Sequence, residues 1–149
     1  MNRCFYTSED LNLGLNKIIQ QINFSLYKPE LIISVNRGGC IPGVYLSHYL
    51  KVPHEVISIQ FRDGHGENKV DYINKYIKNK KRVLIVDDIN DTGKTFGEIR
   101  RMIDNEDSDV KFCALLDNSK SSEKIDFHGK SINKSIDPIW YVFPWENWW

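Results

Sequence analysis

The chain has 149 residues, and its 20 Lys and Arg balance 20 Asp and Glu, so its formal net charge at pH 7 is zero. This length suits one domain with a sizeable core, and the charge balance gives no support to nucleic-acid binding driven by overall charge. No stretch approaches the roughly 20 apolar residues that a membrane span needs. The N-terminus, MNRCFYTSED, lacks a secretory apolar segment, and the widely spaced Cys4, Cys40 and Cys113 are typical of reduced thiols. We therefore expect a cytoplasmic protein that binds neither membranes nor nucleic acid.

The first part of the chain predicts a helix, a buried strand and a second helix. Ser8 is the expected N-cap, and apolar residues at helical spacing predict an amphipathic helix that ends near Ser25. Pro29 prevents its continuation. The apolar run LIISV, residues 31–35, predicts a strand buried on both faces, and residues 41–50 predict the second helix.

A polar turn, Asn36 to Gly39, joins that strand to the second helix. Gly38 and Gly39 would let backbone N–H groups approach an anion closely, and Arg37 adds a charge with several donors. An RGG sequence alone is more often a plain turn. Its position directly after a buried strand favours a binding role for Arg37, Gly38 and Gly39.

The middle of the chain contains a predicted strand, a polar loop and a basic run. Residues 55–61 alternate as in a strand, and residues 62–68 (RDGHGEN) are typical of a mobile loop. His65 lies in this loop, where a single histidine is more often simply solvated. We interpret the basic run at Lys78–Arg82 as a solvated turn, with a nucleic-acid-binding patch as the distant alternative.

The sequence VLIVDDINDTGKT, residues 83–95, is the centre of the prediction. Four apolar residues predict a buried strand that stops at Asp87 and Asp88, followed by a small-residue loop and a helix from Thr95 to about Asn105. Ligands bind at this end of parallel strands, and a helix N-terminus favours phosphate. A nucleotide P-loop is excluded because Asp88 occupies its first glycine position, and no GxGxxG sequence is present.

The last third predicts one more strand and an aromatic tail. Residues 110–116 form the expected strand, which ends at Asp117 and Asn118, while residues 119–134 are polar and are interpreted as irregular. The tail, IDPIWYVFPWENWW, is rich in aromatic residues. Together these elements predict an α/β fold with an open, mainly parallel twisted sheet flanked by helices.

Three of these sequences resemble motifs of the type I phosphoribosyltransferases. VLIVDDINDTGKT is similar to the loop that binds phosphoribosyl pyrophosphate (PRPP), and SVNRGG is similar to the pyrophosphate loop. IWYVFPWE resembles the C-terminal segment of the xanthine-guanine and hypoxanthine enzymes. The resemblance spans about residues 31–146 and implies a single phosphoribosyltransferase domain over residues 1–149. In that family a flexible hood corresponds to residues 62–68.

The resemblance also implies roles for the residues at the acidic strand end. Asp87 and Asp88 would accept the ribose hydroxyls and support a Mg²⁺ ion. The loop of Asp91, Thr92, Gly93, Lys94 and Thr95 would hold the 5-phosphate, and Arg37, Gly38 and Gly39 would contact pyrophosphate. Asp91 matches the position that handles a proton at purine N7, which makes it the expected catalytic residue.

In the base-binding segment, the resemblance implies that Trp140 stacks on the base and that the Tyr141 carbonyl meets an exocyclic group. Glu146 matches an acidic position near the metal. The alternative for the tryptophans is a role in the core or in a dimer interface, and we favour it for Trp145, Trp148 and Trp149.

The chain departs from the family pattern where the oxopurine enzymes usually have a lysine that donates to the purine 6-oxygen. Here Asp117 and Asn118 occupy this place, and Lys120 follows slightly later. Asn118 can both donate and accept, so it could read an amino or an oxo group.

The implied function is Mg²⁺-dependent transfer of the 5-phosphoribosyl group from PRPP to a 6-oxopurine, with release of pyrophosphate, as in purine salvage. The expected partners are PRPP and a free base, in a homodimer or homotetramer. The alternative is a regulator on the same fold that senses PRPP or a nucleotide without turnover. Three ionisable acids, Asp87, Asp88 and Asp91, favour the enzyme, because a sensor could lose them.

Overall fold

The computed structural model describes residues 1–59, 70–104 and 106–149. The predicted hood loop and His65 therefore lie outside the described residues. The helices and strands are β1 (Asn2–Phe5), α1 (Ser8–Ser25), β2 (Leu31–Val35), α2 (Cys40–Leu50), β3 (His54–Ile57), α3 (Val70–Ile77), β4 (Arg82–Asn90), α4 (Lys94–Met102), β5 (Asp109–Asn118), β6 (Phe127–Ile132) and β7 (Ile139–Val142).

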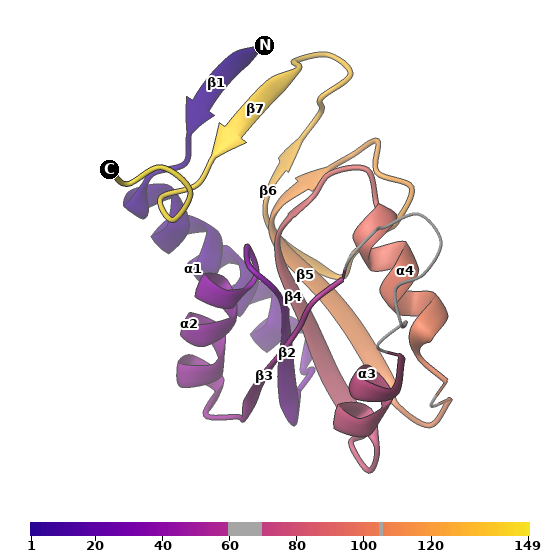
Figure 1. The fold of residues 1–149 in the computed structure, drawn as a ribbon. Coiled ribbons are helices and arrows are strands. Elements are labelled where there is room, and N and C mark those ends of the chain that lie inside the picture. Colours follow the sequence, from indigo (N-terminus) through magenta and orange to yellow (C-terminus); the bar gives the residue numbers. More distant parts are fainter. Residues whose placement is uncertain (60–69, 105) are drawn as a thin grey trace.

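Five strands form a parallel sheet in the order β3-β2-β4-β5-β6, so β4 lies at its centre. The helices cover both faces, with α1 and α2 on one side and α3 and α4 on the other (Figure 1). This confirms the predicted open, parallel sheet flanked by helices. All five carboxyl ends point to the same end of the sheet, where the candidate residues gather.

Each face of the sheet has its own apolar core because side chains alternate along the strands. Ile32, Leu84 and Val86 pack toward α1 and α2, whereas the intervening Ile33 and Ile85 pack toward α3 and α4. Every residue of β2 is buried. The continuous apolar runs of β2 and β4 are therefore explained by two-sided burial, as the sequence predicts.

The first helix begins as the sequence predicts, but its N-cap is Thr7 and not Ser8. The Thr7 hydroxyl accepts from the Asp10 backbone N–H at 3.1 Å, and the Thr7 N–H donates to the Asp10 carboxylate at 2.8 Å. This reciprocal capping box satisfies two N–H groups at once, which Ser8 could not do without a partner three residues later.

Strand β4 is longer than the sequence predicts. The prediction ended it at Val86, but its pairing with β5 continues through Asp87, Ile89 and Asn90. Strand β3 is shorter than predicted and ends at Ile57, while α4 ends at Met102. Asp87 and Asp88, the acid pair, thus lie within the hydrogen-bonded central strand and not in the loop that follows it.

Two strands of the last third were missed: no strand was predicted for the aromatic tail, where β7 lies, and residues 119–134 were interpreted as irregular. Within them β6 pairs in parallel with β5, and it carries apolar residues only at Phe127 and Ile132. Strand β7 pairs in parallel with β1, so the N-terminus lies beside the aromatic tail, away from the main sheet (Figure 1). Short segments of this kind are stabilised by partners far away in the sequence, which local patterns do not reveal.

None of the helices in the described part combines the length and apolar character needed to cross a membrane.

Candidate active site

The acid pair lies near the carboxyl end of β4, directly against the glycine turn that follows β2. A Cβ atom built on Gly38 would lie 2.1 Å from Asp88 Oδ2, and one built on Gly39 would lie 2.2 Å from the Val86 carbonyl oxygen. A side chain at Gly38 would displace the Asp88 carboxylate, and one at Gly39 would collide with the backbone of β4. The two glycines are therefore required for the turn and the acid pair to meet.

The two carboxylates are costly to ionise in this structure. Burial raises the pKa of Asp87 well above its ordinary value, and the neighbouring Asp88 charge raises it further. Burial also raises the pKa of Asp88, to about 6, with a smaller contribution from the Glu146 charge. Two adjacent, desolvated carboxylates favour a bound cation, because its charge offsets both burial and mutual repulsion.

The loop between β4 and α4 encloses a hollow of about 260 Å³ together with the acid pair. Its lining runs without a gap from Asp87 to Phe96 and so contains every residue predicted to bind the ribose and 5-phosphate. Gly93 has a φ of +90°, and a Cβ there would lie 2.4 Å from Ser122 Oγ. The loop leads into the N-terminus of α4, whose N-cap residue, Gly93, provides no side-chain cap, and the positive end of a helix dipole favours an anion.

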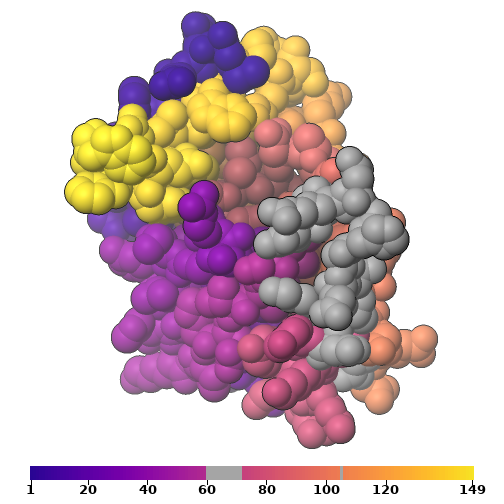
Figure 2. Space-filling view, in the orientation of Figure 1, coloured from indigo at the N-terminus to yellow at the C-terminus, as the bar shows by residue number. Residues whose placement is uncertain are grey.

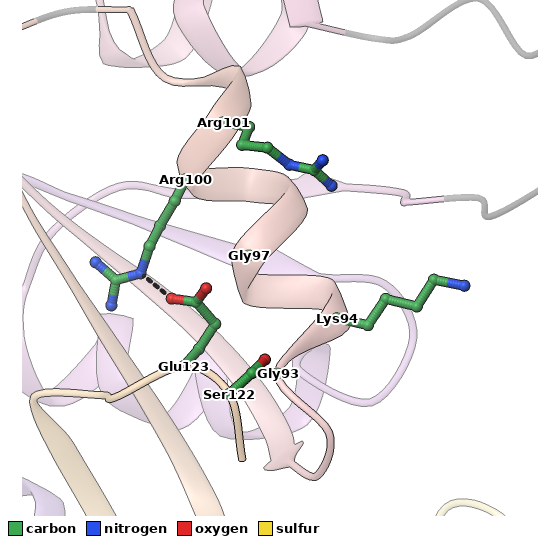
Figure 3. A pocket seen from close by; sticks show the side chains of 7 residues that line it. All are labelled: Gly93, Lys94, Gly97, Arg100, Arg101, Ser122 and Glu123. Carbon is green, nitrogen blue, oxygen red and sulfur yellow. Dashed lines mark ion pairs between the residues drawn. The ribbon is translucent and has the colours of Figure 1, made fainter.

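A larger hollow of about 420 Å³ adjoins this loop along α4 (Figure 3). It shares only Gly93 and Lys94 with the candidate residues. Arg100 pairs with Glu123 across it at 2.8 Å and also donates to the Lys124 carbonyl. These contacts join α4 to the segment that follows β5. They stabilise the position of α4, and with it the loop that precedes this helix.

Sequence analysis missed the importance of Asn90, which is almost fully buried beneath the loop. Its amide donates to the Asp117 carboxylate at 2.8 Å and to the Glu123 carbonyl at 2.9 Å, and it accepts from Ser121. A polar residue inside a turn-forming cluster carries no signal of such burial. Asn90 joins the ends of β4 and β5 and fixes the base of the loop.

The glycine turn leaves Arg37 exposed beside the acid pair. The Gly39 N–H donates to the Val35 carbonyl at 2.9 Å, and the Asn36 N–H donates to the Ile57 carbonyl at 2.7 Å. The Asn36–Arg37 peptide bond is cis. The turn is thus held by β2 and β3, while the Arg37 side chain remains available to a ligand.

Asp91 forms a polar cluster with Asn118 and Lys134. The Asn118 amide donates to the Asp91 carbonyl at 3.1 Å and to its Oδ1 at 3.3 Å, and Lys134 Nζ lies 2.7 Å from its Oδ2. Lys134 was not among the predicted site residues. No local pattern in the sequence marked it, because β6 lacks a regular alternation, but the carboxyl end of β6 lies at the same end of the sheet.

Of the predicted base-binding residues, Trp140 and Tyr141 lie on β7, whereas Asn118 is the last residue of β5. Trp140 is half exposed (52%), and Lys134 Nζ lies 5.8 Å from the centre of its ring. Trp145 instead stacks on Phe143 at 5.0 Å, whereas Trp148 and Trp149 are exposed. Figure 2 shows this C-terminal segment, in yellow, close to the end of β4. Trp140 is therefore the tryptophan whose ring is both accessible and near Asp91.

Glu146 lies close enough to the acid pair to raise the pKa of Asp88, yet its side chain accepts from the Phe143 N–H at 2.9 Å. Among the described residues, no group of three or more His, Cys, Asp or Glu is arranged to hold a metal ion. Mg²⁺ usually binds through one or two carboxylates together with substrate phosphates. Asp87 and Asp88 fit that requirement, with the remaining ligands coming from the substrate and water.

Comparison with known proteins gives a family and a fold. The model of the phosphoribosyl transferase domain matches residues 5–147. A purine phosphoribosyltransferase from Pyrococcus horikoshii is 29% identical, with a TM-score of 0.77 over 99% of this chain and 96% of that one.

Two further structures share the fold at lower identity. A hypothetical protein from Neisseria gonorrhoeae with bound ppGpp has a TM-score of 0.78 at 21% identity, over 98% of this chain and 90% of that one. The xanthine-guanine-hypoxanthine phosphoribosyltransferase from Helicobacter pylori has a TM-score of 0.73 at 19% identity, over 97% and 93%. These matches agree with the resemblance read from the three motifs. With its acid pair, phosphate loop and glycine turn meeting at one end of a parallel sheet, the chain belongs to the type I phosphoribosyltransferase family.

Proposed function

We propose that this protein transfers the 5-phosphoribosyl group of PRPP to a 6-oxopurine (hypoxanthine, guanine or xanthine) and releases pyrophosphate. The observation that carries this proposal is the single hollow that runs from Asp87 to Phe96. It combines a half-buried acid pair, which would bind the ribose, a helix N-terminus, which would bind the 5-phosphate, and Asp91, which would exchange a proton with the base. Residues 1–149 act in this proposal as one phosphoribosyltransferase domain.

Each part of the site has a physical task in this reaction. As pyrophosphate leaves, positive charge develops on the ribose, and the carboxylates of Asp87 and Asp88 stabilise this charge. The same carboxylates accept hydrogen bonds from the ribose hydroxyls. Backbone N–H groups of residues 91–95 bind the 5-phosphate, with Thr92 and Thr95 adding hydroxyl donors. Arg37 and the N–H groups of Gly38 and Gly39 bind pyrophosphate. Asp91 exchanges a proton with the base as its ring nitrogen forms the new bond.

Mg²⁺ is the proposed cofactor, and Asp87 and Asp88 are its proposed protein contacts, with Glu146 nearby. The bound ion would neutralise charge on the phosphates and on the acid pair. The raised pKa values of both aspartates support this assignment, since the ligand-free protein leaves their negative charge desolvated.

The proposed purine preference has two supports. The accessible ring of Trp140 offers a flat surface on which a bicyclic base can stack. The structure at 29% identity is named a purine phosphoribosyltransferase. The Tyr141 carbonyl, next to Trp140 on β7, would accept from an exocyclic amino group of the base.

A nucleotide sensor is the second candidate, and one observation favours it. The Neisseria gonorrhoeae protein with the same fold is described with bound ppGpp, a guanine nucleotide. A site that holds a phosphoribosylated purine as product has the features needed to bind such a nucleotide as a regulator.

Two measurements on the same preparation test these functions. Isothermal titration with PRPP, with and without Mg²⁺, should give binding that depends on the metal. Nucleotide formation is then assayed in parallel with hypoxanthine, guanine, xanthine, adenine, uracil and orotate. Turnover with a pyrimidine alone contradicts the purine assignment, and tight PRPP binding without turnover of any base favours the sensor.

We also propose a homodimer, in which a second copy covers the outer face of α2. Ile41, Val44, Tyr45 and Tyr49 are exposed at helical spacing, and residues 40–50 contain no Asp, Glu, Lys or Arg. An uncharged apolar face is self-complementary, as a two-fold interface requires. Sedimentation velocity should give a dimer for the wild type and a monomer for Tyr45→Glu. The three unpaired cysteines agree with the proposed cytoplasmic location.

A further inference from the structure

Lys134 occupies a position in the site that none of the three sequence motifs includes. It follows β6 and reaches back across β5 to Asp91, 43 residues earlier in the chain, with Nζ 2.7 Å from Asp91 Oδ2. Only 19% of the Lys134 side chain is exposed, against 37% of that of Asp91, so the lysine is the more shielded partner of the ion pair. The same ammonium lies 5.8 Å from the centre of the Trp140 ring. It therefore lies between the proposed proton-transfer group and the proposed stacking surface.

Asn118 stabilises the positions of Asp91 and Lys134, and these hydrogen bonds occupy the groups with which it would otherwise contact a base. Its amide donates to the backbone carbonyl and the carboxylate of Asp91. Its carbonyl oxygen accepts from the backbone N–H of Lys134 at 3.3 Å, and also from that of Lys120. Both ends of the buried Asn118 side chain are thus engaged. Asn118 links Asp91 to the start of the segment that presents Lys134.

Asp117, the other residue expected to face the base, is also engaged. Its carboxylate accepts from the Asn90 amide at 2.8 Å beneath the phosphate loop. The end of β5 therefore serves to hold the loop and Asp91, while the cation that faces the base comes from the turn after β6.

We propose that Lys134 is a specificity-determining residue, which donates a hydrogen bond to the oxygen at the 6-position of the purine and so selects oxopurines over aminopurines. This inference rests on the proposed function. A lysine ammonium has three donors and no acceptor, and Asp91 takes one of them. A 6-oxo group accepts from such a group, whereas a 6-amino group presents its own hydrogen atoms to it. A shielded donor left without an acceptor makes the aminopurine the weaker ligand.

The test compares the binding of two products that differ at this position. Inosine monophosphate and adenosine monophosphate are titrated into the wild type, into Lys134→Met and into Lys134→Gln. Lys130→Met is the matched control, because Lys130 lies exposed on the same strand, β6. PRPP with Mg²⁺ is titrated into each protein, to show that the phosphate side of the site is intact. Turnover of hypoxanthine and adenine is measured alongside.

We expect the wild type to bind inosine monophosphate at least about 10-fold more tightly than adenosine monophosphate. Lys134→Met and Lys134→Gln should reduce this ratio by roughly 10- to 100-fold, as expected for a hydrogen bond from a charged donor. The loss should fall mainly on the inosine nucleotide, and PRPP binding should change little. Lys130→Met should retain the wild-type ratio.

The inference is overturned if the ratio is unchanged in both Lys134 variants, if both nucleotides weaken equally, or if the wild type prefers adenosine monophosphate. In each of these cases PRPP binding and turnover by the wild type can persist, and the proposed function then stands without it. A wild type that binds neither PRPP nor either nucleotide contradicts the proposed function, and the assignment of Lys134 with it.

Discussion

The two sides of the site are built differently. The phosphate side consists of the end of β4, its loop and the glycine turn, and its backbone is fixed by the central strands of a two-sided core. The base side consists of Trp140 on β7, paired with the N-terminal strand β1 outside the main sheet, and of Lys134 in a turn. The phosphate side depends mainly on backbone geometry, which the glycine turn and the central strands hold in place. The base side depends on a few side chains, and so can change its specificity without disturbing the fold.

The same contrast holds for electrostatics. On the phosphate side, Asp87 and Asp88 lack a cationic partner in the described part of the structure, and burial raises the pKa of both. Where the loop meets the base side, the Asp91 carboxylate is already paired with Lys134. The first arrangement favours an incoming cation, whereas the second is a neutral surface suited to an uncharged base.

The largest expected effect is on the chemical step, and it tests whether Asp91 belongs to the base side. Asp91→Asn should lower kcat by roughly 100- to 10,000-fold, the usual range for loss of a general acid or base. PRPP affinity should stay near that of the wild type, because the phosphate cradle is mostly backbone. Steady-state kinetics and PRPP titration measure the two quantities. A matched loss of PRPP affinity would place Asp91 on the phosphate side instead.

The second effect tests the acid pair. Replacing Asp87 and Asp88 together with Asn removes two charged acceptors and should weaken Mg²⁺-dependent PRPP binding by roughly 100- to 1,000-fold. Titration calorimetry at fixed Mg²⁺ measures this change. Asp109→Asn, at the exposed opposite end of the neighbouring strand β5, is the control and should bind PRPP as the wild type does. An unchanged affinity in the double variant would contradict the assignment of the metal and ribose site.

A smaller effect is expected for the stacking surface. Trp140→Ala should raise KM for the base by about 10-fold, since a stacked ring contributes on the order of 1–1.5 kcal/mol. PRPP affinity and thermal stability should change little, because half of this side chain is exposed already. Trp148→Ala, at an exposed tryptophan of the same tail, should leave KM unaltered. An equal effect of both substitutions would remove the distinction between Trp140 and the rest of the tail.

The smallest effect concerns stability and pH. Since the folded protein raises the pKa of Asp88 from 3.8 to about 6, and raises that of Asp87 as well, it binds more protons than the unfolded chain between about pH 4 and 6. The free energy of unfolding of the metal-free protein should therefore fall as pH rises through this interval, by on the order of 1–2 kcal/mol from this pair.

Urea denaturation at several pH values measures the change, and the double Asn variant provides the comparison. The variant lacks both titrating groups, so its stability relative to the wild type should increase from pH 4 to 6. A constant difference between the two proteins across this range would contradict the raised pKa values.

Much of the phosphate side followed from the sequence alone. The apolar runs of β2 and β4 predict strands buried on both faces, and the polar residues after them predict a ligand site at one end of a parallel sheet. Local signals suffice here because the strand, the turn and the helix N-terminus are consecutive in the chain. The N-cap was misplaced by one residue, because Ser8 and Thr7 are both good caps and only the partner Asp10 distinguishes them.

The base side was decided by tertiary structure. Strand β6 is stabilised by pairing with β5, and β7 by pairing with β1, which lies at the opposite end of the chain. Neither strand has the apolar run or the regular alternation that would predict it. Lys134 and Asp91 are 43 residues apart, and parallel pairing of β4, β5 and β6 brings their ends together. A sequence determines such a contact only through the complete sheet, because the free energy that holds each short strand comes from its neighbours in space.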